Sequence, residues 1–150
     1  MLAAMDRRRA SADRNAGIGP GAGTPCPCGH AAGYAACCGR WHDGPLRGQA
    51  PDAESLMRSR YSAYVLNRPD YIAETWHPST RPATVEPDPP GLQWLRLEVK
   101  RHEVQDADHA TVEFVAVSKL GGKAQRLHET SRFVREGGRW AYVAGDWSAG

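Results

Sequence analysis

All four cysteines of this 150-residue chain lie within thirteen residues, as Cys26-Pro-Cys28 followed, eight residues later, by Cys37-Cys38. A segment this short cannot bury a hydrophobic core, and such segments commonly fold around a metal ion. Zinc takes four thiolate or imidazole ligands in a tetrahedron, and four cysteines supply that number. We therefore predict a structural zinc site with Cys26, Cys28, Cys37 and Cys38 as its ligands. Four thiolates leave no position for a catalytic water.

Other interpretations of the cysteines stay open. They could form two disulfides, although a reducing compartment disfavours this, or they could be four unrelated buried thiols. Four cysteines also ligate iron–sulfur clusters, but adjacent Cys37 and Cys38 suit a single small ion better. His30 or His42 could replace one of these two cysteines as a ligand.

Two glycines and a tyrosine are expected to shape the cysteine segment. Gly29 can adopt the positive φ that folds the chain around a metal. Gly39 can end a short helix that we predict over residues 31–37. Tyr34 can cover one side of the small core.

The rest of the chain indicates a cytoplasmic protein. No stretch approaches the roughly 20 apolar residues that span a bilayer, and the N-terminus lacks the apolar region of a secretory signal. Residues 1–24 are predicted to be a disordered leader, and translation could start at Met5. The net charge of +2 is far from that of a dedicated nucleic-acid binder, so we do not expect nucleic acid as a partner.

The predicted organisation is a leader, a cysteine module over residues 25–40, a Gly/Pro-containing linker over 41–51, and a folded domain over 52–150. Within the domain, Asp52 is expected to cap a helix that extends to about Leu66. A second helix is expected from Pro69 to Trp76, followed by an exposed loop over residues 79–91.

The second half of the chain has the alternation of β-strands. Leu95, Leu97 and Val99 alternate with charged residues, and residues 110–119 form a β-rich run with apolar residues on both faces. Gly121-Gly122 and Gly137-Gly138 predict hairpin turns before further strands at 127–134 and 140–145. Helices followed by an antiparallel meander indicate an α+β domain, with helices on one face of a twisted sheet.

Several of these stretches resemble known families. PCPCGHAAGYAACCGR (25–40) resembles the SEC-C motif, the zinc module of the SecA translocation ATPase, with the matching positions Cys26, Cys28, Gly29, Tyr34, Cys37, Cys38 and Gly39. LMRSRYSAYVLNRPDYIAETWHPS (56–79), QWLRLEV (93–99) and TSRFVREGGRWAYVAGD (130–146) resemble the bacterial YchJ family. In that family a SEC-C motif precedes a cone-shaped domain similar to the nuclear transport factor 2-like (SnoaL-like) fold, with helices packed on a curved antiparallel sheet.

The resemblance carries expectations about partners. In SecA the module is associated with binding the chaperone SecB and the ribosome. Residues 32, 33, 35 and 36 are alanine or glycine here, where common SEC-C motifs carry lysines, so binding of this type is disfavoured. A protein partner at the module stays open, and domains of this fold often form homodimers through the sheet.

Cone-shaped domains of this fold often hold a small molecule between sheet and helices. Polar residues that could line such a pocket are Arg60, Tyr61, His77, Glu129, Arg132 and Asp146. In an acid/base mechanism, Glu129 or Asp146 would be the base and His77 or Tyr61 its partner. Each also has a structural interpretation as a core residue, an ion-pair member or a helix cap. The consecutive polar residues 129–132 are the strongest signal, because a central strand tolerates charges only on a solvated or pocket-lining face.

The sequence is compatible with three kinds of function. We favour an adaptor protein whose zinc module docks on a partner or on its own domain. The alternative is a small-molecule-binding protein or an isomerase-, dehydratase- or hydrolase-like enzyme that uses the cone. Nucleic-acid binding ranks third, because the charge is near neutral and the module carries alanines.

Overall fold

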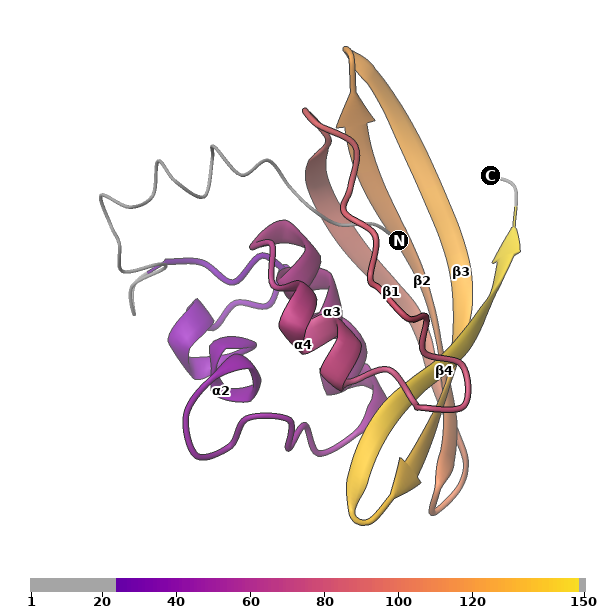
Figure 1. The fold of residues 1–150 in the computed structure, drawn as a ribbon. Helices are drawn as coiled ribbons and strands as arrows, with labels where there is room; N and C mark the ends of the chain where they lie inside the picture. The colour runs from indigo at the N-terminus through magenta and orange to yellow at the C-terminus, as the bar shows by residue number, and fades with distance from the viewer. Residues whose placement is uncertain (1–23, 149–150) are drawn as a thin grey trace.

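Short helices precede four long strands in the computed structural model, which describes residues 24–148 (Figure 1). The 3-10 helix η2 (Tyr34–Ala36) and α2 (Gly39–His42) belong to the cysteine-containing segment. They are followed by α3 (Ala53–Val65) and α4 (Pro69–Glu74), and a loop without regular structure leads to the sheet. The strands are β1 (Gln93–Asp106), β2 (His109–Leu120), β3 (Lys123–Glu136) and β4 (Arg139–Ser148).

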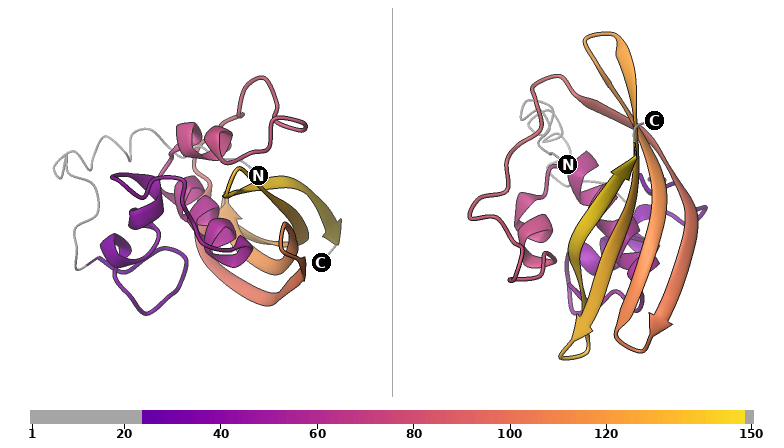
Figure 2. Two further views of the ribbon diagram at one scale, coloured as in Figure 1. Left: turned by 90° about the horizontal axis from the view of Figure 1, so that it is seen from below. Right: turned by 90° about the vertical axis from the view of Figure 1, so that its right-hand side faces the viewer.

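The sheet is the antiparallel meander that the sequence predicts, in the order β1-β2-β3-β4. Gly121 and Gly122 have φ values of 59° and 81°, and Gly137 and Gly138 have 60° and 78°. Two consecutive residues with positive φ are typical of the two-residue turns that match strand twist. Register shifts interrupt both the β1–β2 and the β3–β4 pairings, and such bulges bend strands. The sheet therefore curves around the helices (Figure 2).

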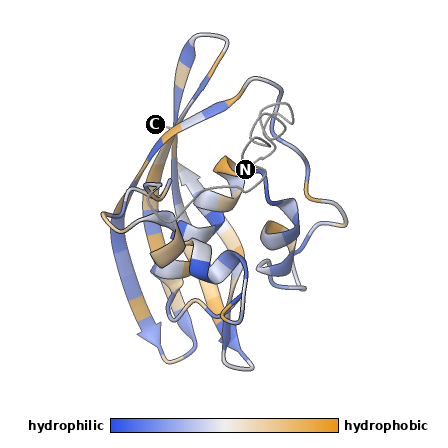
Figure 3. Ribbon diagram, turned by 90° about the vertical axis from the view of Figure 1, so that its left-hand side faces the viewer, coloured by the Kyte–Doolittle hydropathy of each residue, from blue (hydrophilic) through white to orange (hydrophobic). Residues whose placement is uncertain are grey.

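The core lies in the concavity of this sheet. Both faces of the central strand β2 are buried: Val112 and Phe114 point to one side, and Val115 and Val117 to the other. The edge strand β1 is exposed over most of its length and carries alternating charges, which discourages pairing with another sheet (Figure 3).

Helix α3 lies between the sheet and the cysteine-containing segment (Figure 1). It begins as predicted, with Asp52 Oδ1 accepting a hydrogen bond of 2.7 Å from the backbone N–H of Ser55. Every residue from Ser59 to Tyr64 is buried, including the polar Ser59, Arg60 and Ser62. A helix covered on two sides needs no polar stripe, which explains why α3 lacks a clear amphipathic pattern.

Helix α4 ends earlier than predicted. Pro69 occupies its first turn, but the helix stops at Glu74 instead of Trp76. Trp76 instead forms a parallel bridge with Tyr142 of β4. The backbone N–H of His77 donates to the Tyr142 carbonyl at 2.7 Å, and that of Tyr142 donates to the Thr75 carbonyl at 2.9 Å. Tertiary pairing with β4 therefore outweighs continuation of the helix.

The helix predicted over residues 31–37 is wrong. Regular structure there is limited to η2, and Gly39 begins α2 instead of ending a helix. A Cβ atom at Gly39 would lie 2.8 Å from the Tyr34 carbonyl oxygen and 2.9 Å from its ring, so glycine is needed for close packing. Helix α2 also continues through Trp41 and His42, two residues into the expected linker. Apart from Thr24, the expected leader lies outside the described residues.

Within residues 24–148, no helix combines the length and apolar character needed to cross a membrane.

The capping hydrogen bond at Asp52 gives a first prediction. Replacing Asp52 with Ala removes the acceptor for the Ser55 N–H and should lower the free energy of unfolding by about 1 kcal/mol. Asp52→Asn is the matched control, because asparagine caps equally well and should leave stability close to that of the parent. Urea denaturation of the three chains measures the difference. Equal losses in both variants would contradict the capping role.

Candidate metal centre and adjoining cavity

The four cysteine sulfurs converge in the structure. All four side chains are buried, and their Sγ atoms lie within 4.8 Å of one another. The Sγ atoms of Cys28 and Cys37 are 3.7 Å apart. A tetrahedron with metal–sulfur bonds of about 2.3 Å has sulfur–sulfur edges of about 3.8 Å, whereas a disulfide bond is about 2.05 Å long. The four thiols are free of disulfides, and their geometry fits a single tetrahedral metal ion.

Electrostatics in the cluster also point to a cation. Burial and the neighbouring Cys28 raise the pKa of Cys37 to about 12. Hydrogen bonds with Cys26 and Cys28, together with burial, raise the pKa of Cys38 as well, whereas hydrogen bonds from Cys28 and Cys38 lower that of Cys26. Ionising all four thiols in this buried space requires a positive ion between them.

Backbone hydrogen bonds close the segment around the sulfurs. Gly29 has a φ of 89°, the positive value expected from the sequence, and its N–H donates to the Cys26 carbonyl at 3.1 Å. The Cys37 N–H donates to the Tyr34 carbonyl at 2.9 Å, and Pro25 forms a bridge with Gly33. The two cysteine pairs are thereby brought to one point from opposite ends of the segment.

His42 attaches this segment to the rest of the protein. Its side chain is fully buried, with Nδ1 2.6 Å from the Tyr34 hydroxyl and Nε2 2.8 Å from the Ser59 carbonyl of α3. The Ser59 oxygen can only accept, so Nε2 donates, and Nδ1 accepts from Tyr34 in the neutral ring. Burial lowers the pKa of His42, which favours this neutral form. Both nitrogens are engaged and His30 is exposed, so neither histidine joins the sulfur cluster.

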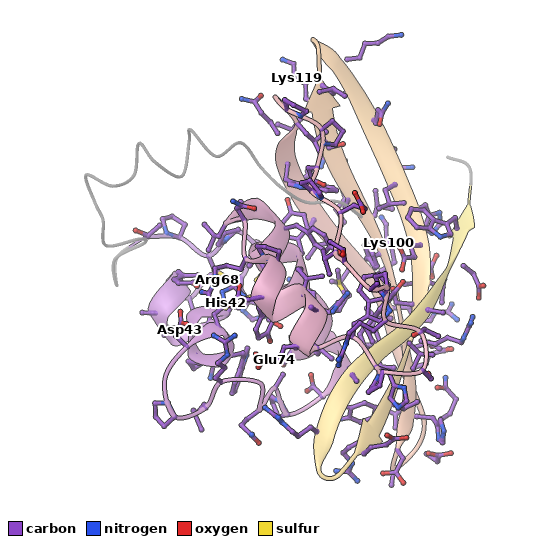
Figure 4. The ribbon with its side chains drawn as sticks, in the orientation of Figure 1. His42, Asp43, Arg68, Glu74, Lys100 and Lys119 are labelled. Carbon is purple, nitrogen blue, oxygen red and sulfur yellow. The ribbon has the colours of Figure 1, made fainter. Side chains whose placement is uncertain are left out.

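Charged side chains also link the cysteine-containing segment and the residues that follow it to the helices of the domain. Arg58 of α3 donates to the Cys28 carbonyl at 3.0 Å and to Glu54 at 2.9 Å. On the other side, Arg68 contacts both carboxylate oxygens of Asp43 at 3.0 Å, next to His42 (Figure 4). Arg47 lies 2.7 Å from Glu74 of α4. The cysteine-containing segment is therefore fixed to both α3 and α4.

A cavity of about 40 Å³ lies between α3 and the concave face of the sheet. Three of the six pocket residues proposed from the sequence line it: Arg60, Tyr61 and Glu129. The side chain of Glu129 is buried and accepts hydrogen bonds from Ser131 Oγ at 2.5 Å and from the Tyr142 hydroxyl at 3.2 Å. Gly145 makes room for it, since a Cβ there would overlap the carboxylate.

The other three proposed residues lie elsewhere. Arg132 and Asp146 form an exposed ion pair of 2.8 Å, on the opposite side of the sheet from Glu129. Residues three apart on a strand point to opposite faces, which explains the position of Arg132. His77 contacts Glu136 at 2.9 Å in a separate surface cavity. The acid/base pairs that involve His77 or Asp146 are therefore not assembled.

Sequence reasoning missed several residues of the cavity. Ser131 lay within the polar run 129–132 but was not separated from its neighbours, and Phe133 was not named; both follow Glu129 at the two-residue spacing of one sheet face, so the alternation on β3 could have identified them. Tyr142 and Trp147 reach the cavity from β4, where Trp147 is the cross-strand partner of Glu129. That register depends on the bulge between Arg132 and Phe133, which the sequence does not show.

Known proteins share this arrangement. The family model described as "YchJ, middle NTF2-like domain" matches residues 52–145. The chain belongs to the YchJ family. Among relatives, a UPF0225 protein of Bordetella parapertussis is 58% identical over 127 residues, which cover 85% of this chain and 96% of the relative. A UPF0225 protein of Methylibium petroleiphilum is 62% identical over 122 residues, covering 81% and 88%.

Solved structures extend the similarity of this YchJ-family chain to the cysteine-containing segment. A SEC-C motif containing protein from Rhodopseudomonas palustris aligns with a TM-score of 0.69 and 35% identity, covering 81% of this chain and 96% of the other. A sec-c motif containing protein from Psychrobacter arcticus also has a TM-score of 0.69, with 30% identity and coverage of 86% and 85%. The expected fold, a cone-shaped α+β domain with an N-terminal cysteine module, is confirmed.

A buried carboxyl at the edge of the cone gives a prediction about pH. Asp88 accepts a hydrogen bond of 3.0 Å from Trp94 Nε1, and burial raises the pKa of this carboxyl from 3.8 to about 7. Between these two values the folded chain holds a proton that the unfolded chain releases. The folded state therefore loses stability as the pH rises through this window, and the cost persists at higher pH.

Asp88→Asn should remove this cost while keeping an acceptor for Trp94. We expect the variant to be more stable than the parent at pH 8, by on the order of 2 kcal/mol, with the difference shrinking towards pH 4. Urea denaturation at pH 4, 6 and 8 measures it. A difference independent of pH would show that Asp88 is not a buried titrating group.

Proposed function

We propose that this YchJ-family chain is a zinc-binding protein in which one structural Zn²⁺ keeps the SEC-C module folded as an interaction element on the cone-shaped domain. The observation that carries the proposal is the convergence of four buried sulfurs, at a spacing that suits tetrahedral Zn²⁺. The ligands would be Cys26, Cys28, Cys37 and Cys38. Thiolate ligands favour zinc over hard cations such as magnesium or calcium.

The surroundings of the sulfurs support a structural role. Four protein ligands complete a tetrahedron, so no open position is left for a substrate or an activated water. Two arginines support the ligand backbone, with Arg58 donating to the Cys28 carbonyl and Arg40 Nε to the Cys37 carbonyl, each at 3.0 Å. Their positive charges offset the net charge of about −2 that four thiolates and Zn²⁺ would carry.

The exposed side of the module supports an interaction role. One side is occupied by α3 through His42 and Arg58. The module also exposes small residues, namely Ala31, Ala32, Ala35 and Ala36, and two of them, Ala32 and Ala36, line a surface cavity beside Arg58. Small side chains allow close approach of another protein backbone, whereas the absence of lysines disfavours an acidic partner of the SecB or ribosome type. A rigid, metal-fixed surface also reduces the entropy cost of binding.

Metal analysis tests the structural half of the proposal. The purified chain should contain one zinc per molecule, and removal by a strong chelator should collapse the amide dispersion of residues 25–42 in a proton–nitrogen correlation spectrum. Resonances of β2 and β3 serve as the internal control, because these strands are paired without the module. An unchanged spectrum for residues 25–42 after complete metal removal would overturn the structural role.

Site-specific photocrosslinking tests the interaction half. A benzophenone amino acid at Ala36 should crosslink to a protein partner in cells, and substitution of Cys28 and Cys37 by serine should abolish the product. The same probe at Ala107, an exposed residue of the β1–β2 turn, is the matched control and should give no such product. Identical crosslinks at both positions, or crosslinks insensitive to the cysteine substitutions, would refute a zinc-dependent interaction surface.

A further inference from the structure

The cavity inside the cone contains two buried groups of opposite charge that are not paired with each other. Arg60 is 6% exposed and Glu129 is 4% exposed, and both line the cavity. Arg60 Nη1 donates to the Ile72 carbonyl at 2.8 Å and to Thr75 Oγ1 at 2.7 Å. Among residues 24–148, no ion pair joins Arg60 to Glu129. Burying charges without direct pairing is costly, so their common cavity suggests a use for both.

The same cavity has a donor that lacks an acceptor. Nε1 of Trp76 is buried and has no hydrogen-bond partner among the described residues. The indole packs edge-on against Tyr142 at 5.2 Å between ring centroids, and the guanidinium of Arg60 lies 5.2 Å from its ring centroid. A buried indole N–H usually finds a partner, so an acceptor is missing at this place.

An apolar cavity adjoins this polar one. It has a volume of about 300 Å³ and is lined mainly by Pro89, Leu92, Trp94, Leu120, Leu127 and Trp147. Trp147 lines both cavities and is 59% exposed. The inner cavity of about 40 Å³ has room for only a few atoms, whereas 300 Å³ reaches the lower range of small-molecule sites. The two adjoining cavities could therefore hold one ligand, with a small polar head group in the inner cavity and an apolar body in the outer one.

We propose that the cone binds a small neutral molecule whose apolar body occupies the outer cavity and whose head group carries an acceptor beside a donor, as a carboxamide does. The acceptor oxygen takes the hydrogen bonds of Trp76 Nε1 and Arg60, and the donor N–H is directed at Glu129. Glu129 repels a carboxylate and Arg60 repels an ammonium group, so the two charges together select against net charge on the ligand. This site does not depend on the metal centre.

Titration of the full chain with three probes of similar size tests the proposal. Benzamide has the required head group, benzoate replaces it with a charge, and toluene lacks it. We expect benzamide to bind with a dissociation constant on the order of a millimolar and to shift the amide resonances of Glu129, Tyr142 and Trp147. Benzoate and toluene should each bind about tenfold more weakly or not detectably.

Three variants make the result specific. Glu129→Gln removes the negative charge with little change of shape and should weaken benzamide about tenfold while leaving toluene unchanged. Glu136→Gln, the same substitution at an exposed position of β3, is the matched control and should leave benzamide unaffected. Trp147→Ala shortens the wall of both cavities and should weaken all probes together.

Each alternative result overturns the proposal in a recognisable way. Equal binding of toluene and benzamide, insensitive to Glu129→Gln, would show an apolar cavity without head-group recognition. Tighter binding of benzoate would show that Arg60 selects an anion. Absence of binding by all three probes would show that the cone is closed to ligands of this class.

Discussion

The structure depends on the burial of helix α3 from two sides. Its inner side packs into the concave sheet through Met57, Tyr61 and Tyr64, and its outer side is covered by the cysteine-containing segment. Ser59 and Ser62 are fully buried on that outer side, where Ser59 supplies a carbonyl to His42 and Ser62 lies 3.7 Å from the sulfur of Cys26. A helix of this composition would leave apolar and polar groups unmatched if either cover were missing.

This arrangement explains why a cysteine-containing segment of thirteen residues matters to a domain that has its own core. The segment lacks the apolar residues to fold alone, and its fold is needed to place His42 and Trp41 against α3. If the four cysteines bind the proposed Zn²⁺, its binding free energy would stabilise the contact between this segment and α3 as well as the segment itself. The charged contacts of Arg47 and Arg68 are more exposed and contribute less, because solvent screens them.

Local signals made much of the fold predictable. Two-residue alternation, a β-rich run over residues 110–119 and two pairs of glycines indicated the four strands, and Asp52 marked the start of α3, because these features act through neighbours in sequence. Long-range contacts were not predictable. Gly39 could be read as a helix end because the ring of Tyr34 that excludes a side chain there is set by tertiary packing. Nothing in the sequence around His42 indicates that its two nitrogens form hydrogen bonds with Tyr34 and with the Ser59 carbonyl of α3.

In the candidate cavity, too, some residues could be predicted from local sequence and others are set by long-range pairing. Strand periodicity alone separates Glu129 from Arg132, so that part of the pocket could have been assigned correctly from the sequence. The register of β4 could not, and with it the roles of Tyr142 and Gly145. Gly145 is required at its position, because any side chain there would occupy the space of the Glu129 carboxylate. A strand accepts a glycine at some cost in stability, and here that cost creates room for a buried charge.

Helix α3 also connects the two sites. Ser59 faces the cysteine-containing segment, and the next residue, Arg60, faces the cone, where it holds α4 through Ile72 and Thr75. Successive residues of a helix point about 100° apart, so one turn of α3 presents groups to both sites at once. This turn therefore offers a direct route by which the cysteine-containing segment could influence the cone. The same geometry keeps the two sites chemically separate, with the cysteine sulfurs on one side of the helix and the cavity with Arg60 and Glu129 on the other.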